Sequence, residues 1–283
     1  MSSGIEKALE KSRRRGGRNM VVAPSGRELG SPGRRADLTR RIEARLALAR
    51  MEEPELLDQA ALEQRKIIHP EMMDTPTGNA IREIRTKIFK SVGEEGMVIS
   101  VIPIVPESGA SFVAWNLAAA IALDESRSAL VVGFDFVTPE EGGSEADTVI
   151  GIGDYLEDES DEIQESDIIY PSGIRRVRHV PAGYSRSNMA EKLNSIKLQQ
   201  FIHSVASRYD NRFVILDAPP LMESADSVIL GEMSDACILV LPYGRLTKKQ
   251  FADALDIIGR DSVFGVVLND VPLVTPWFRS KPR

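Results

Sequence analysis

The chain has 283 residues, with 35 Lys and Arg against 42 Asp and Glu, and its formal net charge is −7. Hydrophobic residues make up 42% and charged residues 27%, values that exclude a wholly disordered or fibrous chain and allow one large or two small domains. No apolar run approaches the roughly 20 residues that cross a bilayer, and the charged N-terminus does not look like a secretory signal.

Positive charge is concentrated at the N-terminus. Residues 1–50 contain 13 Lys and Arg against 5 Asp and Glu, a net charge of +8 that leaves −15 for the rest of the chain. Such an arm either contacts anionic lipid, nucleic acid or an acidic partner, or it is a solvated tail. Glycine and proline over residues 16–36 predict a linker, between a short helix at Ile5–Lys11 and one or two helices over residues 37–66, broken at Pro54.

A regular pattern begins near residue 76. Asn79–Ser91 predicts a helix with Ile81, Ile84, Ile88 and Phe89 on one face. Short apolar strands then alternate with helices. The predicted strands are Met97–Ile104, Ala129–Phe136, Val177–Pro181, Phe213–Asp217, Ala236–Pro242 and Val263–Asn269. The predicted helices are Ser111–Leu123, Ser195–Arg208, Ser224–Met233 and Lys248–Ile258, the last ended by Gly259.

These strands are continuously apolar, which is typical of a parallel sheet covered on both faces. Repeated strand–helix–strand units predict an α/β fold with a doubly wound, mostly parallel sheet. Ligands of such sheets bind at the carboxyl ends of the strands, so the loops to search are 105–111, 135–154, 217–223 and 242–246.

The single cysteine, Cys237, lies in an apolar run and is expected to be a buried core thiol. With one cysteine and only His69, His179 and His203, a zinc site has little support. Residues 140–167 contain 12 acids and no Lys or Arg. We expect a solvated insertion there; the alternatives are a segment that repels phosphate from the site or one that docks a basic partner.

The segment that follows the first predicted strand occupies the position of a P-loop, where backbone N–H groups and a helix N-terminus face a phosphate. In the pattern G-x-x-x-x-G-K-[ST], Gly109 and Ser111 fit the last glycine and the hydroxyl residue, but Ile104 and Ala110 stand at the first glycine and the lysine. The motif alone is weak. Its context is stronger, because Phe213–Asp217 has the form of a Walker B strand, four apolar residues ending in an acid.

Several motifs in this order resemble the bacterial tyrosine kinases of exopolysaccharide synthesis, over about residues 76–272. They are Asn79–Thr86, the P-loop position, Leu130–Asp135, Gly151–Leu156, Val180–Gly183, Asp217–Pro220 and Gly265–Asn269. Ile5–Leu9 resembles the N-terminus of the exosortase-associated branch. The resemblance implies a P-loop NTPase fold of the MinD/ParA type, Mg-ATP, ring-like oligomers and a membrane polysaccharide co-polymerase, the chain-length determinant, as activating partner.

The sequence departs from the family at the positions that carry charge. The family loop resembles P-G-E-G-K-S, whereas this chain has Ala110 at the lysine and Glu107 at the first glycine of that stretch. Of the family's D-x-D, Gly133 replaces the first acid and Asp135 remains. No tyrosine follows Tyr243, although the autokinases end in a tyrosine-rich tail. Because phosphoryl transfer depends on electrostatic positioning, the protein is predicted to be a pseudokinase that needs no cofactor and has no assigned catalytic residue.

The retained positions predict where nucleotide would bind if the site still works. Gly109, Ser111, Asp135, Asp217 and Asn269 are the cofactor positions, with Ser111 and Asp217 as Mg²⁺ ligands and Asn269 matching the family residue that contacts adenine. Structural explanations stay open: a helix start for Ser111, a strand end for Asp217 and a turn for Asn269.

The predicted domains are a basic arm at 1–75, a kinase-like domain at 76–275 and a tail at 276–283. Arg82 and Arg85 match two arginines of the family's oligomer-forming helix, whose leading acid is here Asn79. The resemblance places the protein in the cytoplasm, at the inner face of the bacterial inner membrane, with a co-polymerase or a kinase paralogue as partner, a homo-oligomer possible and no nucleic acid.

Three functions stay open from the sequence. The first is a catalytically impaired regulator or scaffold of exopolysaccharide production and export. The second is an active, divergent autokinase with a cation from elsewhere, for which Lys248 and Lys249 cannot yet be assigned. The third is a MinD/ParA-like positioning ATPase.

Overall fold

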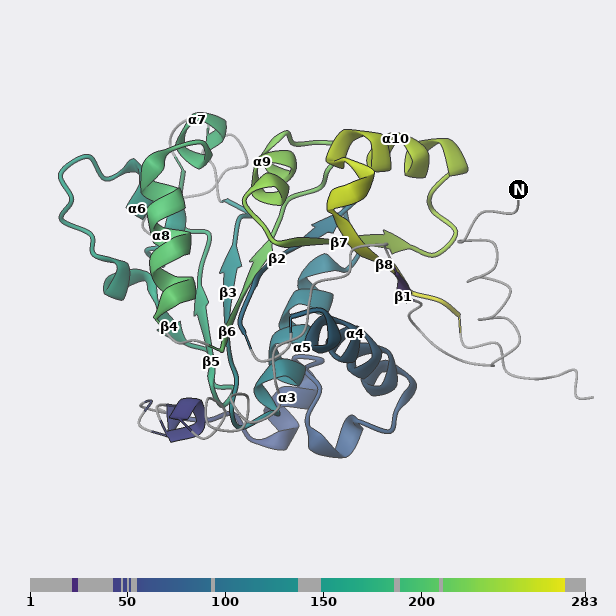
Figure 1. Ribbon diagram of the computed structural model, residues 1–283, viewed down its shortest axis with the longest axis horizontal. Helices are drawn as coiled ribbons and strands as arrows, with labels where there is room; N and C mark the ends of the chain where they lie inside the picture. The colour runs from purple at the N-terminus through teal and green to yellow at the C-terminus, as the bar shows by residue number, and fades with distance from the viewer. Residues whose placement is uncertain are drawn as a thin grey trace, which may run out of the picture.

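A single eight-stranded sheet with helices on both faces forms the centre of the protein (Figure 1). The computed structural model describes residues 22–24, 43–46, 48–49, 51, 55–92, 95–136, 149–185, 189–208 and 211–272. The predicted tail at 276–283 and the short helix at Ile5–Lys11 lie outside these ranges.

The central strands of the sheet are parallel. Across the sheet the order is β1 (Val22–Pro24), β8 (Val263–Asn269), β7 (Ala236–Pro242), β2 (Val98–Pro103), β6 (Arg212–Asp217), β3 (Ser128–Gly133), β5 (Val177–Val180) and β4 (Tyr170–Pro171). All neighbours from β8 to β5 pair in parallel, and only the two edge strands, β1 and β4, are antiparallel to theirs. The predicted doubly wound, mostly parallel sheet is confirmed.

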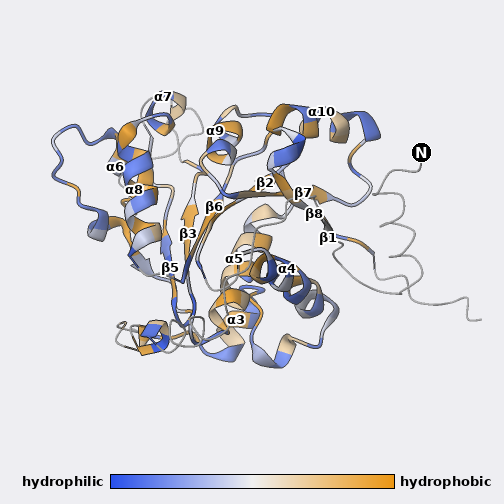
Figure 2. Cartoon of the chain, in the orientation of Figure 1, coloured by the Kyte–Doolittle hydropathy of each residue, from blue (hydrophilic) through white to orange (hydrophobic). Residues whose placement is uncertain are grey.

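The helices divide into two layers (Figure 1). One face of the sheet carries α3 (Gln59–Gln64), α4 (Pro76–Val92) and α5 (Ala110–Ala122). The other carries α6 (Ile152–Glu157), α7 (Met189–Leu193), α8 (Ile196–Ser207), α9 (Asp226–Glu232) and α10 (Lys248–Ile258). Three short 3₁₀ helices also lie in the described ranges: η1 (Pro70–Met72), η4 (Glu165–Ile168) and η5 (Arg260–Ser262). Figure 2 shows apolar residues concentrated along the strands and on the inward faces of the helices.

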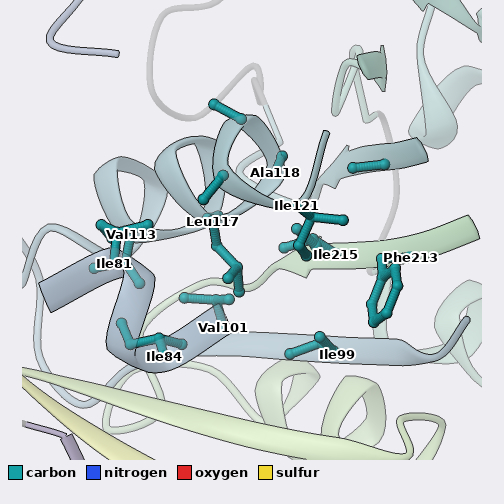
Figure 3. Close-up of a cluster of buried hydrophobic side chains, with 14 of the residues drawn as sticks. Ile81, Ile84, Ile99, Val101, Val113, Leu117, Ala118, Ile121, Phe213 and Ile215 are labelled. Carbon is teal, nitrogen blue, oxygen red and sulfur yellow. The ribbon is translucent and has the colours of Figure 1, made fainter. Parts of the chain in front are cut away.

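Alternation along the strands creates two separate cores. Ile99 and Val101 of β2 face α4 and α5, whereas Val98 and Ile102 belong to the cluster beneath α8, α9 and α10. Figure 3 shows the first cluster, in which side chains of α4 and α5 meet β2 and β6. Because successive side chains of a strand point to opposite faces, each apolar strand contributes to both cores.

A buried amide joins the N-terminal part of the chain to α5. The Asn116 carboxamide accepts from the N–H of Ile68 at 2.7 Å and donates to the carbonyl oxygens of Lys66 at 3.0 Å and Phe112 at 2.8 Å. Ile67 and Ile68 are buried in the same core as α4 and α5. The folded part of the chain therefore extends to the N-terminal side of residue 76.

Two expectations from the sequence are wrong in part. Residues 16–36 were expected to be a linker, but β1 pairs antiparallel with β8 there, with Val22 opposite Val267. The acidic segment 140–167 was expected to be a solvated insertion, but its described part, 149–167, contains α6 and buries Ile152 and Leu156. Acidic composition does not predict that the segment packs against the core, because only a few apolar residues between the carboxylates anchor it.

The cysteine prediction is confirmed. Cys237 is fully buried on β7 with its Sγ 3.5 Å from the carbonyl oxygen of Gly231, and burial raises the pKa of its thiol to about 11. In the described parts of the chain, no helix has the length and apolar character to cross a membrane, and no group of three His, Cys, Asp or Glu side chains is placed to hold a metal.

The α4–sheet contact should contribute strongly to stability. Ile84 is 1% exposed in the first core, so Ile84→Ala is expected to lower the free energy of unfolding by about 2–5 kcal/mol in urea titrations. Ile196, which is 70% exposed, is the control, and Ile196→Ala should change stability by less than about 0.5 kcal/mol. Equal effects of the two replacements would contradict this packing of α4.

Candidate functional site

Strand pairing brings the predicted site residues to one edge of the sheet. Asp217 at the end of β6 lies opposite Val101 of β2 on one side and Gly133 of β3 on the other. Asn269 at the end of β8 lies opposite Pro242 at the end of β7. Because these strands run parallel, the loops at their carboxyl ends surround the start of α5.

The loop between β2 and α5 is held by a side chain of β8. Gly109, the residue before α5, has φ 81°, and a Cβ built there would come 2.1 Å from Nδ2 of Asn269. Nδ2 of the buried Asn269 donates to the carbonyl oxygen of Ser108 at 3.1 Å. Asn269 is therefore a contact residue of the loop itself, and only glycine fits beside it at position 109.

The lysine position of the loop is an apolar residue at the helix start. Ala110 is the first residue of α5 and is 5% exposed, and residues 104–111 contain no Lys or Arg. Val113 is the first α5 residue whose N–H bonds to a carbonyl before it in the helix, that of Gly109 at 3.1 Å. The N–H groups of the first turn are thus at the helix end, where an anion is favoured, but the charge that a P-loop lysine supplies is missing.

The loop carries a carboxylate and a strained backbone at Glu107, where the loop pattern has a glycine. Glu107 has φ 56°, in the left-handed region that favours glycine. The Arg245 guanidinium, from the loop between β7 and α10, donates to the carbonyl oxygens of Glu107 at 2.7 Å and Pro106 at 3.1 Å. It also lies 3.2 Å from Oε2 of Glu107, so the loop contains an internal ion pair.

The predicted Mg²⁺ residues lie together. The Ser111 hydroxyl hydrogen-bonds to the Asp217 carboxylate, and Asp135 is close enough to act on it electrostatically. Burial raises the pKa of Asp217 to about 6; the Ser111 hydrogen bond lowers the pKa, and the negative charge of Asp135 raises it further. An acid whose charged form lacks solvation is a position that a cation would stabilise, so the donor set fits Mg²⁺ although one acid of the family's pattern is missing.

Lack of room does not explain why position 133 is a glycine rather than an aspartate. A Cβ built on Gly133 would meet the backbone N of Ala182 at 3.4 Å, an ordinary van der Waals contact. An aspartate side chain therefore has room to start from this position beside Asp217.

Two cavities adjoin the site in the described part of the chain. A cavity of about 490 Å³ lies against the loop and is lined by Lys66, Thr77, Gly109, Phe112, Asn269, Asp270 and Val271. A second, of about 560 Å³, is lined by Asp135, Val149, Tyr170, Pro171, His179, Pro181, Ala182 and Gly183. Lys66, in the lining of the first cavity, is a residue that sequence patterns did not indicate.

The two arginines of α4 make contacts within the chain. Arg82 donates to the carbonyl oxygen of Met73 and lies 3.2 Å from Oδ1 of Asp74. Arg85 donates to the carbonyl oxygen of Ala120 at 2.9 Å, and burial lowers its pKa. Their role in an oligomer stays a prediction, because these contacts are all intramolecular.

Arg245 is the site residue that the sequence analysis missed. It lies in the predicted ligand loop 242–246, but no motif distinguishes it from Lys248 and Lys249, which begin α10. Only the pairing of β7 with β2 brings its loop beside the P-loop position.

The fold and this loop define a P-loop ATPase fold of the kind found in bacterial tyrosine-kinase domains. The kinase domain of the Escherichia coli tyrosine kinase ETK superposes over 78% of this chain and 89% of its own with a TM-score of 0.60 and 21% identity. The BceF tyrosine kinase domain covers 87% of this chain, with a TM-score of 0.56 and 23% identity. These likenesses concern the fold.

The sequence relatives are named bacterial tyrosine-protein kinases. The chain is 26% identical over 210 residues to the tyrosine-protein kinase YwqD of Bacillus subtilis, spanning 86% of that protein. It is 28% identical over 198 residues to the tyrosine-protein kinase wzc of Salmonella typhimurium, but spans only 26% of that longer protein. No family model matches the chain. The protein is thus a homologue of the bacterial tyrosine-protein kinases, as the motifs predicted.

The half-buried Asp217 should make stability depend on pH. A carboxyl group with a pKa of 3.8 in the unfolded chain and about 6 in the folded one costs nothing while protonated and destabilises the fold once ionised. The full cost, up to about 3 kcal/mol, is present above about pH 6 and absent below about pH 4.

Asp217→Asn should therefore gain stability relative to wild type as the pH rises from 4 to 7, measured by urea unfolding at each pH. Ser111→Ala removes the hydrogen bond that stabilises the charged form, so it should move the pH dependence of the Asp217-containing protein upward. A constant difference between wild type and Asp217→Asn across this range would refute the assignment.

Proposed function

We propose that the protein is a catalytically impaired, tyrosine-kinase-like regulator or scaffold in exopolysaccharide biosynthesis and export. The observation that carries this proposal is the loop before α5, where Ala110 stands at the lysine position and Glu107, at φ 56°, adds a carboxylate to the loop. Phosphoryl transfer needs positive charge around the transferred phosphate, and the loss of such a charge lowers rates by orders of magnitude.

The residues that remain support a regulatory rather than a catalytic use of the fold. Gly109, Ser111, Asp217 and Asn269 preserve the shape of the site through their mutual contacts. Mg-ATP is the ligand this arrangement would take, with Ser111 and Asp217 as the Mg²⁺ residues and the cavity beside Asn269 for the base. Without the lysine and the acid at Gly133, binding should be weak.

One observation favours a second candidate, a divergent ATP-dependent autokinase of the same pathway. Arg245 is a cation from another loop that is bonded to the P-loop position. Arg245 would have to supply the positive charge of the lysine and also support the same rate of phosphoryl transfer. Its planar guanidinium is already hydrogen-bonded to the loop carbonyls. The pseudokinase therefore remains the proposed function.

Activity assays separate the two candidates. Purified full-length protein should hydrolyse no Mg-ATP above a buffer control and should incorporate no labelled phosphate into its own tyrosines, assayed beside the Bacillus subtilis YwqD kinase as positive control. Phosphate incorporation into tyrosine that disappears in Asp217→Asn would show that the site is catalytic and the proposal wrong.

Recruitment to the membrane is the second part of the proposal. The partner would be a polysaccharide co-polymerase or an active kinase paralogue at the inner face of the inner membrane, contacted through the basic arm and through α4. Attraction through the arm is screened above about 0.15 M salt, where the Debye length falls below roughly 8 Å, whereas packing through α4 is not.

Co-purification with membranes should therefore lose its salt-sensitive part when Arg13, Arg14 and Arg15 are replaced by Gln, a change that leaves β1 intact. The remaining part should be lost in Arg82→Ala and kept in the control Lys90→Ala, an exposed position in the last turn of α4. A protein that recovers no component of polysaccharide assembly under any of these conditions would exclude the scaffold role.

A further inference from the structure

The strongest unexplained feature of the site is the contact between Arg245 and the loop. Nη2 of Arg245 donates to two loop carbonyls, those of Glu107 and Pro106, and Nη1 lies 3.2 Å from the Glu107 carboxylate. The two charged side chains remain accessible, since Arg245 is 47% and Glu107 85% exposed. An exposed ion pair by itself stabilises a protein little, so stability does not account for this arrangement.

The backbone at Glu107 indicates that the pair depends on the loop's conformation. A non-glycine residue at φ 56° is strained, and the carbonyl of this residue accepts the shortest of the Arg245 hydrogen bonds. The guanidinium thus lies against the same short loop whose last residue, Gly109, leads into the N–H groups of α5.

A guanidinium has five N–H donors in a fixed plane, and the contacts of Arg245 with Glu107 and Pro106 use its two terminal nitrogens. Phosphate is a stronger acceptor for this group than a single exposed carboxylate, because its oxygens carry more charge and can accept two N–H groups at once. An anion at the start of α5 would compete with Glu107 for Arg245.

We propose that Arg245 is the phosphate-binding cation of this loop, and that the Glu107 carboxylate pairs with Arg245 when no phosphate is bound. The ligand class is the phosphate group of a nucleoside di- or triphosphate seated at the start of α5. This inference rests on the proposed function, because it concerns binding at a site that does not transfer phosphate. It gives the site a positioned cation from the loop between β7 and α10 in place of the missing lysine.

The test is calorimetry on the full-length protein with Mg-ATP, ADP and adenosine as ligands. Glu107→Gln removes the ion pair with Nη1 of Arg245 and should tighten Mg-ATP and ADP binding by about tenfold or more, the size expected from one charge-assisted hydrogen bond to phosphate. Adenosine, which has no phosphate, should bind Glu107→Gln and wild type equally. Adding Arg245→Ala to Glu107→Gln should remove the gain.

A second ion pair supplies matched controls. Asp256 of α10 and Arg260 of η5 form an exposed pair, with Nη2 2.8 Å from Oδ1, and take no part in the site. Asp256→Asn alters net charge as Glu107→Gln does, and Arg260→Ala as Arg245→Ala does, so neither should change Mg-ATP affinity.

Two results would overturn the inference. One is an Arg245→Ala variant that binds Mg-ATP as tightly as wild type or more tightly. The contact of Arg245 with the loop would then only stabilise the loop conformation. The other is an unchanged affinity in Glu107→Gln whose melting temperature matches wild type. ATP hydrolysis or tyrosine phosphorylation by the wild type would instead refute the proposed function and leave the role of Arg245 to be decided by the affinities.

Discussion

The parallel pairing of β2 with β6 on one side and β7 on the other is the constraint on which the site depends. It places Val101 beside Asp217 and Pro103 beside Val240, so the loops after these three strands meet at one edge of the sheet. Burial of both faces fixes this register, because a shift by one residue would turn the apolar side chains of β2 into the wrong core. Residues more than 130 positions apart, such as Glu107 and Arg245, come into contact through this pairing.

Within this frame the residues around the loop before α5 are closely packed, and their charges differ from those of the P-loop pattern. Gly109 and Asn269 fit one another so closely that neither position tolerates much change. Around them, the positive charge that the family places at the helix start is replaced by Ala110, and an arginine from another loop faces a carboxylate instead. Asp217, half-buried and with a raised pKa, has Gly133 rather than an acid opposite it on β3.

The sequence predicted the elements whose side chains repeat regularly. Continuous apolar strands gave β7 and β8 at the residues where the structure has them, and Gly259 ends α10 as expected. The short edge strands β1 and β4 were not predicted, because two or three residues carry no recognisable periodicity and their pairing depends on the neighbouring strand. The prediction of a solvated insertion at residues 140–167 was wrong in part for a similar reason, since Ile152 and Leu156 anchor the segment by tertiary packing.

The site residues also divide into those that a sequence motif indicates and those that only the tertiary structure brings to the site. Ser111, Asp135 and Asp217 were recognised because each follows a strand or starts a helix in a known motif, and the structure brings them together. Arg245 and Lys66 were missed because their importance comes from position in space: one through the β2–β7 pairing, the other through the Asn116 hydrogen bonds. The raised pKa of Asp217 likewise follows from burial, which a motif does not report.

The central claim is that the protein acts without catalysis, and the most direct measurement is exopolysaccharide output in the host. Asp217→Asn introduced at the native locus should leave output at the wild-type level, because the proposed role needs the fold and its contacts, no phosphoryl transfer, and only the weak Mg-ATP binding expected at this site. Output that falls to the level of a gene deletion, with the amount of protein unchanged on immunoblots, would contradict the account.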